Sequence, residues 1–531
     1  MKPILTARCV RRRIAAAAAA LFLLVGLAAC GSPGGGGSSE GLPKDLKVLV
    51  EATQPVFDQW QGGVATQGVM LLVNEPLVRY DGSGFQPNLA TTFEQASPTR
   101  YVFTLRDGVT FSDGSPVTVD DVRFTFEQAM RDDHLSTTHV VMRSIATITT
   151  DGSSIALDLK APQPLLLYTI ARTGIVSKAF YEQHGEKVGT PAVGQLGSGP
   201  YVLDSFEPDK SMRVVKRPDY WGDPAPFESI TFTIVPDDSA RMLALQSGSA
   251  NAIFEIPTGQ INSIQALKDF RLSKIADATV FILQMDVTKP PFDEPAVRDA
   301  VRHAINRQAV VDAALAGHGQ VARALSPQSN LELVASAEAV EQTLARIDEL
   351  NTYDPDLARR LLASSSVPAG FTLKLPLDST DADTSLVAQT IAQDLAEVGI
   401  DVELDPRGDD YIDVTLARRH DGLTLNKFST NAPDPAMPLG YFVPAKSRIN
   451  LTQQDNPAAQ QAFDESNALP VGDPKRGERL LAAVEAYHRG GAALPLVNPD
   501  MTFGLKAPMT INGFTNYWWM QRWDRLVEVG G

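Results

Sequence analysis

"RYVFTLRDGVTFSDGSPVTVDDVRFTFEQA", residues 100–129, combines a strand pattern with a helix pattern. Apolar side chains alternate with others from Tyr101 to Leu105, which is the period of a half-buried β-strand. Two Asp-Gly pairs follow, and they predict tight turns. Thr118 and, three residues later, Asp121 predict a capping box at the start of a helix. The stretch therefore predicts strand, turn and helix in direct succession, which is typical of a mixed α/β protein.

The same succession recurs along the chain. "LKVLV", residues 46–50, predicts a buried strand, and "TVFILQM", residues 279–285, predicts another. A helix follows the second strand, with Asp293 as its N-cap and Pro295 in its first turn. A later helix is expected to end at Gly399 and to lead into a strand, with a buried face formed by Leu386, Ile391, Leu395 and Val398. Because helices alternate with short strands, we expect largely parallel sheets.

The N-terminal segment has the pattern of an export signal. "MKPILTARCVRRR" carries five basic residues and no acid, and an apolar run from Ile14 to Leu27 follows it. "LAAC", residues 27–30, resembles a bacterial lipobox, which implies cleavage before Cys30 and acylation of its thiol. We therefore expect a signal peptide at 1–29 and a lipidated Cys30 with a flexible, glycine-rich tether at 30–43. The alternative is an ordinary signal peptide that ends at Ala29, with Cys30 incidental.

Composition disfavours several classes of function. The chain has 531 residues, a formal net charge of −16 and two cysteines. Removal of the basic signal makes the charge more negative, which disfavours nucleic acid and anionic membrane surfaces as partners. With Cys9 removed and Cys30 acylated, the mature chain has no cysteine for a disulfide, a thiolate metal site or nucleophilic catalysis.

Catalytic motifs are missing from the sequence. It contains no HExxH, no Walker loop and no dinucleotide fingerprint after a strand, and "GSSEG" at 37–41 falls in the tether. His134 and His139 are more simply part of a solvated loop than a metal site. No pair of acids is singled out for glycoside hydrolysis. An enzyme is therefore the weakest hypothesis, and we expect no catalytic residue, metal or cofactor.

Four collinear segments carry a resemblance to a known family. They are "PNLATTFEQASPTRYVFTLRDGVTFSDGSPVTVDDVRFTFEQA", "GSGPYVL…VKRPDYWGD…ITFTIVPDDSARMLALQSGSAN", "KPPFDEPAVRDAVRHAINRQAVV" and "YDPDLARRLL" followed by "QDLAEVGIDVEL". Together they cover nearly all of the mature chain. They resemble the extracytoplasmic solute-binding proteins of ABC importers, family 5, the peptide/nickel-type group. Tyr220 and Trp221 are expected to pack one domain against its neighbour.

The resemblance implies a type II periplasmic-binding fold, an α/β architecture of two lobes and a hinge enlarged by an extra α/β domain. We place lobe I at 44–81, 198–276 and 495–531, the extra domain at 82–197 and lobe II at 277–494. The resemblance also implies that the ligand binds between the lobes, which close on it without covalent chemistry.

Two of the loops expected to face the ligand flank predicted strands. The loop after the first strand offers Gln54, Phe57 and Trp60 as ligand contacts. In the loop matching "LPLDST", dipeptide binders of the family place an arginine for the peptide carboxylate. Ser379 holds that place here.

The third loop is "NKFSTNAPDPAMPLGYF", residues 426–442. In peptide binders the matching loop resembles W-x-x-D-x-x-D-P, and its first acid pairs with the amino terminus of the peptide. Phe428, Asn431 and Asp434 match the pattern here, so the acid position holds a neutral amide. We expect Asp434 to shape the loop more than to contact the ligand. Loss of both charged anchors weakens the case for a free dipeptide, and leaves a longer peptide or a neutral solute such as an oligosaccharide.

The functional prediction follows from these implications. We expect an exported, monomeric lipoprotein, held by Cys30 on the outer face of the cell membrane, on the periplasmic or extracytoplasmic side. It captures peptides or polar solutes of similar size and delivers them to ABC permease subunits. A lipoprotein of the same fold that regulates envelope assembly and transports nothing is the main alternative, and a hydrolytic enzyme is the weaker one.

Overall fold

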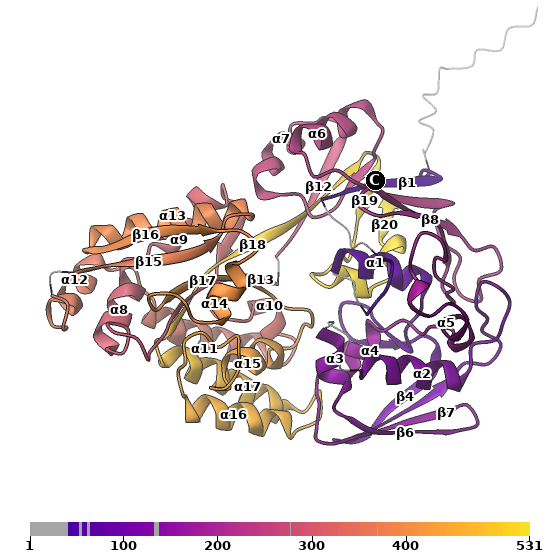
Figure 1. Cartoon of the computed structure of the whole chain (residues 1–531), viewed down its shortest axis with the longest axis horizontal. Coiled ribbons are helices and arrows are strands. Elements are labelled where there is room, and N and C mark those ends of the chain that lie inside the picture. Colours follow the sequence, from indigo (N-terminus) through magenta and orange to yellow (C-terminus); the bar gives the residue numbers. More distant parts are fainter. Residues whose placement is uncertain are drawn as a thin grey trace, which may run out of the picture. The chain divides into compact units, whose positions relative to one another are not determined.

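The computed structural model describes residues 41–51, 56–60, 64–131, 137–276, 278–368 and 370–530. Within these ranges the largest sheet has ten strands, eight of which follow the order β17-β13-β18-β11-β1-β10-β9-β8 (Figure 1). The ten strands are β1 (Asp45–Val50), β8 (Tyr201–Glu207), β9 (Ser211–Lys216), β10 (Ser229–Ile234), β11 (Ala252–Ile253), β12 (Phe270–Ala276), β13 (Thr279–Met285), β14 (Gly319–Val321), β17 (Leu423–Ser429) and β18 (Ala493–Lys506).

The pairing in this sheet corrects one expectation. β1 pairs in parallel with β10 and β11, whereas the other pairs described in the sheet are antiparallel. The prediction of largely parallel sheets is therefore wrong. β8 and β9 are joined by a short turn, which pairs them antiparallel. β18 runs antiparallel to all four of its partners, β11, β12, β13 and β14.

β18 pairs with strands from distant parts of the chain. Residues 493–497 pair with β13, residues 497–499 with β14, and residues 500–506 with β12, while β11 pairs with Gly504 and Leu505. The predicted boundary between residues 494 and 495 thus falls inside this strand. The other domain boundaries stay predictions.

The segment 90–184 forms a separate sheet with helices beside it (Figure 1). Its strand order is β4-β5-β7-β6, all antiparallel. The predicted capping box of α2 is confirmed, because the side chains of Thr118 and Asp121 each accept a hydrogen bond from the other's backbone N–H. The elements are β4 (Ala90–Ser97), β5 (Arg100–Leu105), β6 (Ile145–Asp151), β7 (Ser154–Leu159), α2 (Val119–Ala129), α3 (Thr137–Met142), α4 (Leu166–Ala171) and α5 (Lys178–His184).

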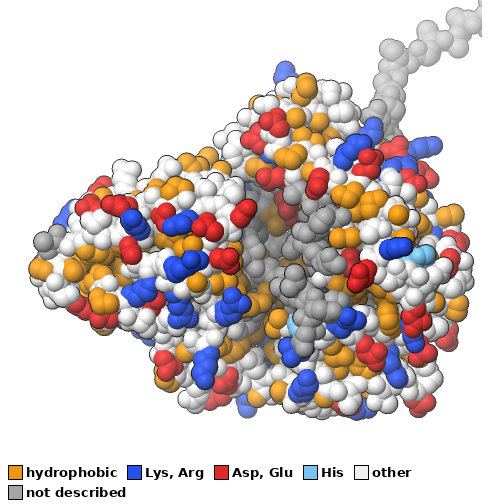
Figure 2. All heavy atoms as spheres, in the orientation of Figure 1, with side chains coloured by type: hydrophobic (Ala, Val, Ile, Leu, Met, Phe, Trp, Pro, Cys, Tyr) orange, Lys and Arg blue, Asp and Glu red, His pale blue; other side chains and the backbone are white. Residues whose placement is uncertain are grey.

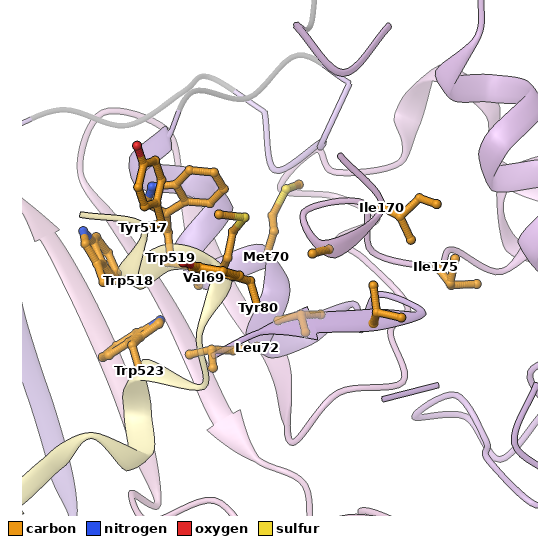
Figure 3. Packing of buried hydrophobic residues seen from close by; sticks show 14 of the residues in the cluster. Val69, Met70, Leu72, Tyr80, Ile170, Ile175, Tyr517, Trp518, Trp519 and Trp523 are labelled. Atoms are coloured by element: carbon orange, nitrogen blue, oxygen red, sulfur yellow. The ribbon is translucent and has the colours of Figure 1, made fainter. Parts of the chain in front are cut away.

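One hydrophobic cluster joins this smaller sheet to the large one. It contains Tyr101 and Phe103 of β5 together with Leu46 and Val48 of β1. Aromatic side chains of residues 517–523 complete it, and Figure 3 shows Trp518, Trp519 and Trp523 beside the side chains of α1 (Val64–Val73). The indole N–H of Trp523 donates to the backbone oxygen of Gly68 over 2.9 Å. The N-terminal and C-terminal parts of the fold therefore share one core.

The segment 295–489 is mainly helical and packs around β13, β17 and the parallel pair β15–β16. Ile391 and Leu395 of α13 are buried as predicted, but Leu386 is 43% exposed. The helix instead buries Val387 and Ala388. The elements are α8 (Pro295–Ala304), α9 (Arg307–Ala314), α10 (Gln328–Leu331), α11 (Ala337–Leu350), α12 (Pro355–Ala363), β15 (Phe371–Asp378), α13 (Ala382–Glu397), β16 (Ile400–Arg407), α14 (Tyr411–Leu416), α15 (Ala436–Phe442), α16 (Pro457–Asn467) and α17 (Pro474–Arg489).

Smaller elements complete the description. Pro295 is the first residue of α8 as expected, but the N-cap is Glu294 and not Asp293, a shift of one residue. The remaining strands and α-helices are β2 (Val78–Tyr80), β3 (Phe85–Pro87), α6 (Asp238–Ser247), α7 (Ile261–Gln265), β19 (Met509–Ile511) and β20 (Val527–Val529), and short 3-10 helices lie at Gly185–Lys187, Thr258–Gln260, Trp518–Met520 and Trp523–Arg525. Figure 2 shows acidic and basic side chains interspersed over the visible face, which favours solubility.

A buried carboxylate holds the loop 217–223 against α1 and β2. Glu75 is fully buried, and its side chain accepts hydrogen bonds from Arg79 (3.0 Å), from the hydroxyl of Tyr220 (2.7 Å) and from the indole of Trp221 (2.8 Å). Buried charge is tolerated when it is paired and fully hydrogen-bonded. Glu75, Tyr220 and Trp221 all fall in the ranges predicted for lobe I, so the expected packing of one domain against its neighbour stays a prediction.

Replacement of Gly68 by alanine tests the packing of α1 against the C-terminal aromatic residues. At a solvent-exposed position inside a helix, replacement of glycine by alanine stabilises the folded protein by about 0.5–1 kcal/mol. Here a Cβ would lie 2.8 Å from a ring carbon of Trp518. We therefore expect a loss of roughly 1–3 kcal/mol of unfolding free energy by chemical denaturation. Gly84→Ala, where the new Cβ meets no atom within 4 Å, is the matched control and should be near neutral. A stabilised Gly68→Ala variant would contradict this packing.

Candidate functional site

A pocket of about 240 Å³ lies beside Asn431, the residue aligned with the acid of peptide binders. Its walls come from residues 140–141 in α3, residues 162–172 around α4, and residues between 431 and 467 around α15 and α16. This Asn431 pocket is therefore formed between the segment of the predicted extra domain and that of predicted lobe II. Most of its lining side chains are apolar or uncharged.

Arg172 is the only charged residue among the described residues that line this pocket. It follows the last residue of α4 and is 5% exposed. Burial lowers the pKa of its guanidinium to about 10, an effect opposed by Tyr441 across the pocket. Since this pKa lies well above neutral pH, the side chain stays charged. The pocket thus combines an apolar wall with one buried positive charge.

The loop that carries Asn431 is fixed by Tyr517. The Tyr517 hydroxyl lies 2.6 Å from the hydroxyl of Thr430 and 3.1 Å from the backbone oxygen of Ala432. The side-chain amide of Asn330 donates to the same hydroxyl over 2.9 Å. The backbone N–H of Asn431 donates to the sulfur of Met437 over 3.2 Å. These contacts hold the backbone on both sides of Asn431.

Asp434 lies in the same loop but is bound to Arg476. The Nη2 atom of Arg476 is 2.9 Å from both carboxylate oxygens, and the two side chains are 1% and 2% exposed. The carboxylate also accepts the backbone N–H of Ala436 over 2.9 Å. This arrangement favours the loop-shaping role over a ligand contact. Phe428 packs edge-on against Tyr441 and Phe442 and is half-buried.

The loop after β1 is only partly within the described residues. Gln54 lies outside them. Phe57 is fully buried and packs against Phe206, and Trp60 is also buried, which favours packing roles over the predicted ligand contacts. Between them, the side chain of Gln59 accepts the backbone N–H of Gly174 (2.9 Å) and donates to its oxygen (2.8 Å). The loop is thus clamped to the chain that follows Arg172.

Ser379 lies next to a second cavity, of about 550 Å³. Its hydroxyl is exposed and donates to the backbone oxygen of Arg407 over 2.6 Å, so it closes the end of the β15–β16 pair. Its neighbours Asp378 and Thr380 line the cavity. On the opposite wall, Thr258 donates to Asp383 over 2.8 Å, and burial raises the pKa of that carboxyl. The predicted ligand-contact role of Ser379 stays a prediction.

Cys30 and His134 lie outside the described residues. Within the described part of the chain, no three His, Cys, Asp or Glu side chains are grouped so as to hold a metal ion. The helices described there are also too short or too polar to cross a membrane.

Arg172, Tyr517 and Gln59 are site residues that sequence reasoning missed. Arg172 directly follows the apolar run "LLLYTIA", residues 165–171. A single charged residue at the end of such a buried helix could have marked it as a candidate. Tyr517 acts on a loop far from it in the sequence, and no local pattern marks such a contact.

A family model described as bacterial extracellular solute-binding proteins, family 5 middle, matches residues 84–448. The chain belongs to this family. Its members are extracytoplasmic proteins that bind solutes for transport and are not enzymes, so this family 5 protein is a binding protein.

Curated relatives are similar over part of the chain. The glutathione-binding protein GsiB of Escherichia coli (strain K12) is 30% identical over 308 residues, which is 57% of this chain and 57% of that protein. GsiB of Salmonella typhimurium is 31% identical over 304 residues, 56% of each chain. This family 5 protein thus aligns with little more than half the length of these relatives.

Solved structures resemble it over nearly the whole chain. The periplasmic binding protein DppA of Helicobacter pylori, in complex with the peptide STSA, has 21% identity and a TM-score of 0.73, and the match covers 92% of this chain and 98% of that one. NikA of Staphylococcus aureus, in complex with Ni(L-His)2, has 17% identity and a TM-score of 0.69, covering 92% and 100%. The predicted type II periplasmic-binding fold is therefore confirmed.

Asp58, between Phe57 and Trp60, gives this family 5 protein a pH-dependent stability. Its side chain is 8% exposed, and burial raises its pKa to about 6, against a smaller opposing effect of the Trp60 backbone N–H at 3.0 Å. Because the unfolded pKa is about 3.8, the folded state keeps this proton over a range in which the unfolded chain has lost it. The contribution of Asp58 to stability therefore falls as pH rises from about 4 to about 6.

We expect Asp58→Asn to remove this penalty. Between pH 4 and pH 7, the unfolding free energy of the variant relative to the native chain should rise by roughly 2–3 kcal/mol, measured by denaturant titration. Asp107→Asn, in an exposed turn, is the control and should follow the native profile. A constant difference between Asp58→Asn and the native chain would show that the loop does not bury this carboxyl.

Proposed function

We propose that this chain is the solute-binding lipoprotein of an ABC importer. It captures a peptide, or a polar solute of similar size, between two lobes and delivers it to a membrane permease. The observation that carries the proposal is the family match over residues 84–448, which includes the Asn431 pocket loop. The relatives point the same way, since they are named for glutathione, itself a tripeptide, and one similar structure holds the peptide STSA.

We infer that the lobes and the extra domain have the predicted ranges, with β18 shared between the lobes. The position of the Asn431 pocket supports this, because its walls combine residues 140–172 with residues 431–467. Closure around a solute removes water from polar groups on both sides and orders the loops that contact it. Phe428 and Asn431 keep their proposed ligand contacts on the loop of this pocket, and Ser379 keeps its proposed contact beside the second cavity.

Binding of a solute is tested on the mature chain with peptide and oligosaccharide libraries. A ligand that binds the folded state alone stabilises it by about 2.7 kcal/mol at a hundredfold excess over Kd, which raises Tm. We expect peptides to raise Tm and oligosaccharides to do so less. Mass spectrometry of solutes released from the purified protein identifies what it carries. If no peptide or polar solute raises Tm and none co-purifies, the proposal is wrong.

We further propose that Cys30 is acylated and holds a monomer on the outer face of the membrane through the tether 30–43. The support is the "LAAC" pattern and the glycine-rich segment after it. Cys30→Ala should move the protein from the membrane fraction to the soluble fraction, measured by fractionation and immunoblotting. Cys9→Ala, inside the predicted signal, is the control and should stay with the membrane. Membrane retention of Cys30→Ala would refute the anchor.

A further inference from the structure

The second cavity, of about 550 Å³, lies between segments of the two predicted lobes. One wall is formed by residues between 238 and 259 and by residues 499–502, and the opposite wall by residues between 378 and 383 together with Lys427. The hydroxyl of Thr258 donates to Asp383 from one wall to the other over 2.8 Å. A solute held between the lobes would therefore be in a position to enter this cavity.

The two basic residues among the described residues that line this cavity are already paired. The guanidinium of Arg241 is paired with Asp238, and its side chain is 2% exposed. The Nζ atom of Lys427 is 2.5 Å from the carboxylate of Asp381. An anionic ligand would have to break one of these ion pairs to obtain a counter-charge.

Three carboxylates that line the cavity, those of Glu51, Asp378 and Asp383, form no ion pair with any described residue. Glu51 is exposed, whereas Asp378 and Asp383 are half-buried. Burial raises the pKa of Asp383, and hydrogen bonding from Thr258 and the charge of Lys427 offset this only in part. Because a nearby positive charge stabilises the ionised form of such a carboxyl, these residues favour a cation in the cavity.

A buried hydroxyl in the opposite wall points independently to a ligand. Thr502 of β18 lines the cavity and is fully buried, and its Oγ has no hydrogen-bond partner among the described residues. Its backbone oxygen, by contrast, accepts the N–H of Ile256 over 2.8 Å. Buried polar atoms are nearly always hydrogen-bonded, so this hydroxyl is open to a donor that enters the cavity.

We propose that the second cavity receives a positively charged organic group of the solute, an ammonium or a guanidinium. The group donates hydrogen bonds to the carboxylates of Asp378 and Asp383 and to the hydroxyl of Thr502. The inference rests on the proposed function and names the charge of the group bound beside Ser379. The neutral Ser379 fits this polarity, since the resemblance places an arginine there when the group bound is a carboxylate.

The test uses three random tripeptide libraries with free carboxyl termini and otherwise neutral side chains. The first has a free amino terminus, the second is N-acetylated and carries one lysine, and the third is N-acetylated and carries one Nε-acetyl-lysine, so that it has no positive charge. Each is incubated with the mature chain, and bound peptide is measured by native mass spectrometry. We expect at least one cationic library to be retained about tenfold better than the third, because the third makes no charge-assisted contact.

The comparison of the first two libraries shows whether the positive group is an amino terminus or a side chain. Equal retention of all three libraries overturns the proposal.

Variants assign the preference to the cavity. The double variant Asp378→Asn and Asp383→Asn removes both half-buried charges with little change of shape, and should abolish the preference for cationic peptides. Asp401→Asn removes an exposed carboxylate of β16 that does not line the cavity, and should keep the preference.

Thr502→Val gives a second readout if the double variant does not fold. It replaces an unpaired buried hydroxyl by a methyl group of similar shape, so Tm without peptide should be unchanged or higher. Retention of the preferred cationic library should nevertheless fall several-fold. An unchanged preference in the folded double variant, or unchanged retention in Thr502→Val, overturns the proposal.

The outcomes separate this inference from the proposed function. Binding of all three libraries without preference refutes the cationic group and leaves the solute-binding function intact. Binding of none of them counts against peptide capture itself, and the inference fails with it.

Discussion

The pairing of β18 is the constraint on which the large sheet depends. Along the order of that sheet, β18 stands between β13 and β11, and it pairs with both. Without it, the strands of residues 45–253 and those of residues 279–429 would have no common neighbour in the described part of that order. The two ends of β18 have different partners, so this one strand joins the two sets of strands into a single sheet.

Buried charged side chains hold the loops and turns beside the large sheet in place. Arg217 is 3% exposed and donates to the backbone oxygens of Thr110, Phe111 and Ser198, which ties the turn after β5 to the end of β9. Glu75 does the same for the loop 217–223. Each group is costly to bury and has several partners, so each specifies one arrangement of its neighbours. Near the Asn431 pocket, the side-chain amide of Gln59 makes two hydrogen bonds with the backbone of Gly174 and so holds the chain that follows Arg172.

Sequence reasoning succeeded where the signal is local. The capping box at Thr118 depends on residues three apart, and the Asp-Gly turns place Gly108 and Gly114 at positive φ, where glycine is favoured. It failed where the partner is distant. Antiparallel pairing along β18, the exposure of Leu386, and the approach of Arg172 to the Asn431 loop all depend on tertiary packing. The family resemblance supplied the fold and pointed to the loop that carries Asn431, but it gave no sign that Arg172 lines the pocket beside that loop.

β18 lies near the C-terminal end of the chain, and this position affects how the large sheet folds. Ile253 pairs with Gly504 and Phe281 with Val497, so the sheet is completed by a segment far downstream of its partners. Such distant pairings form slowly, since a long loop must close before the contact is made. The large sheet of this chain cannot be complete until residues 493–506 have been synthesised and have joined strands on both sides. A chain that ends before them lacks the strand that links its two sets of partners.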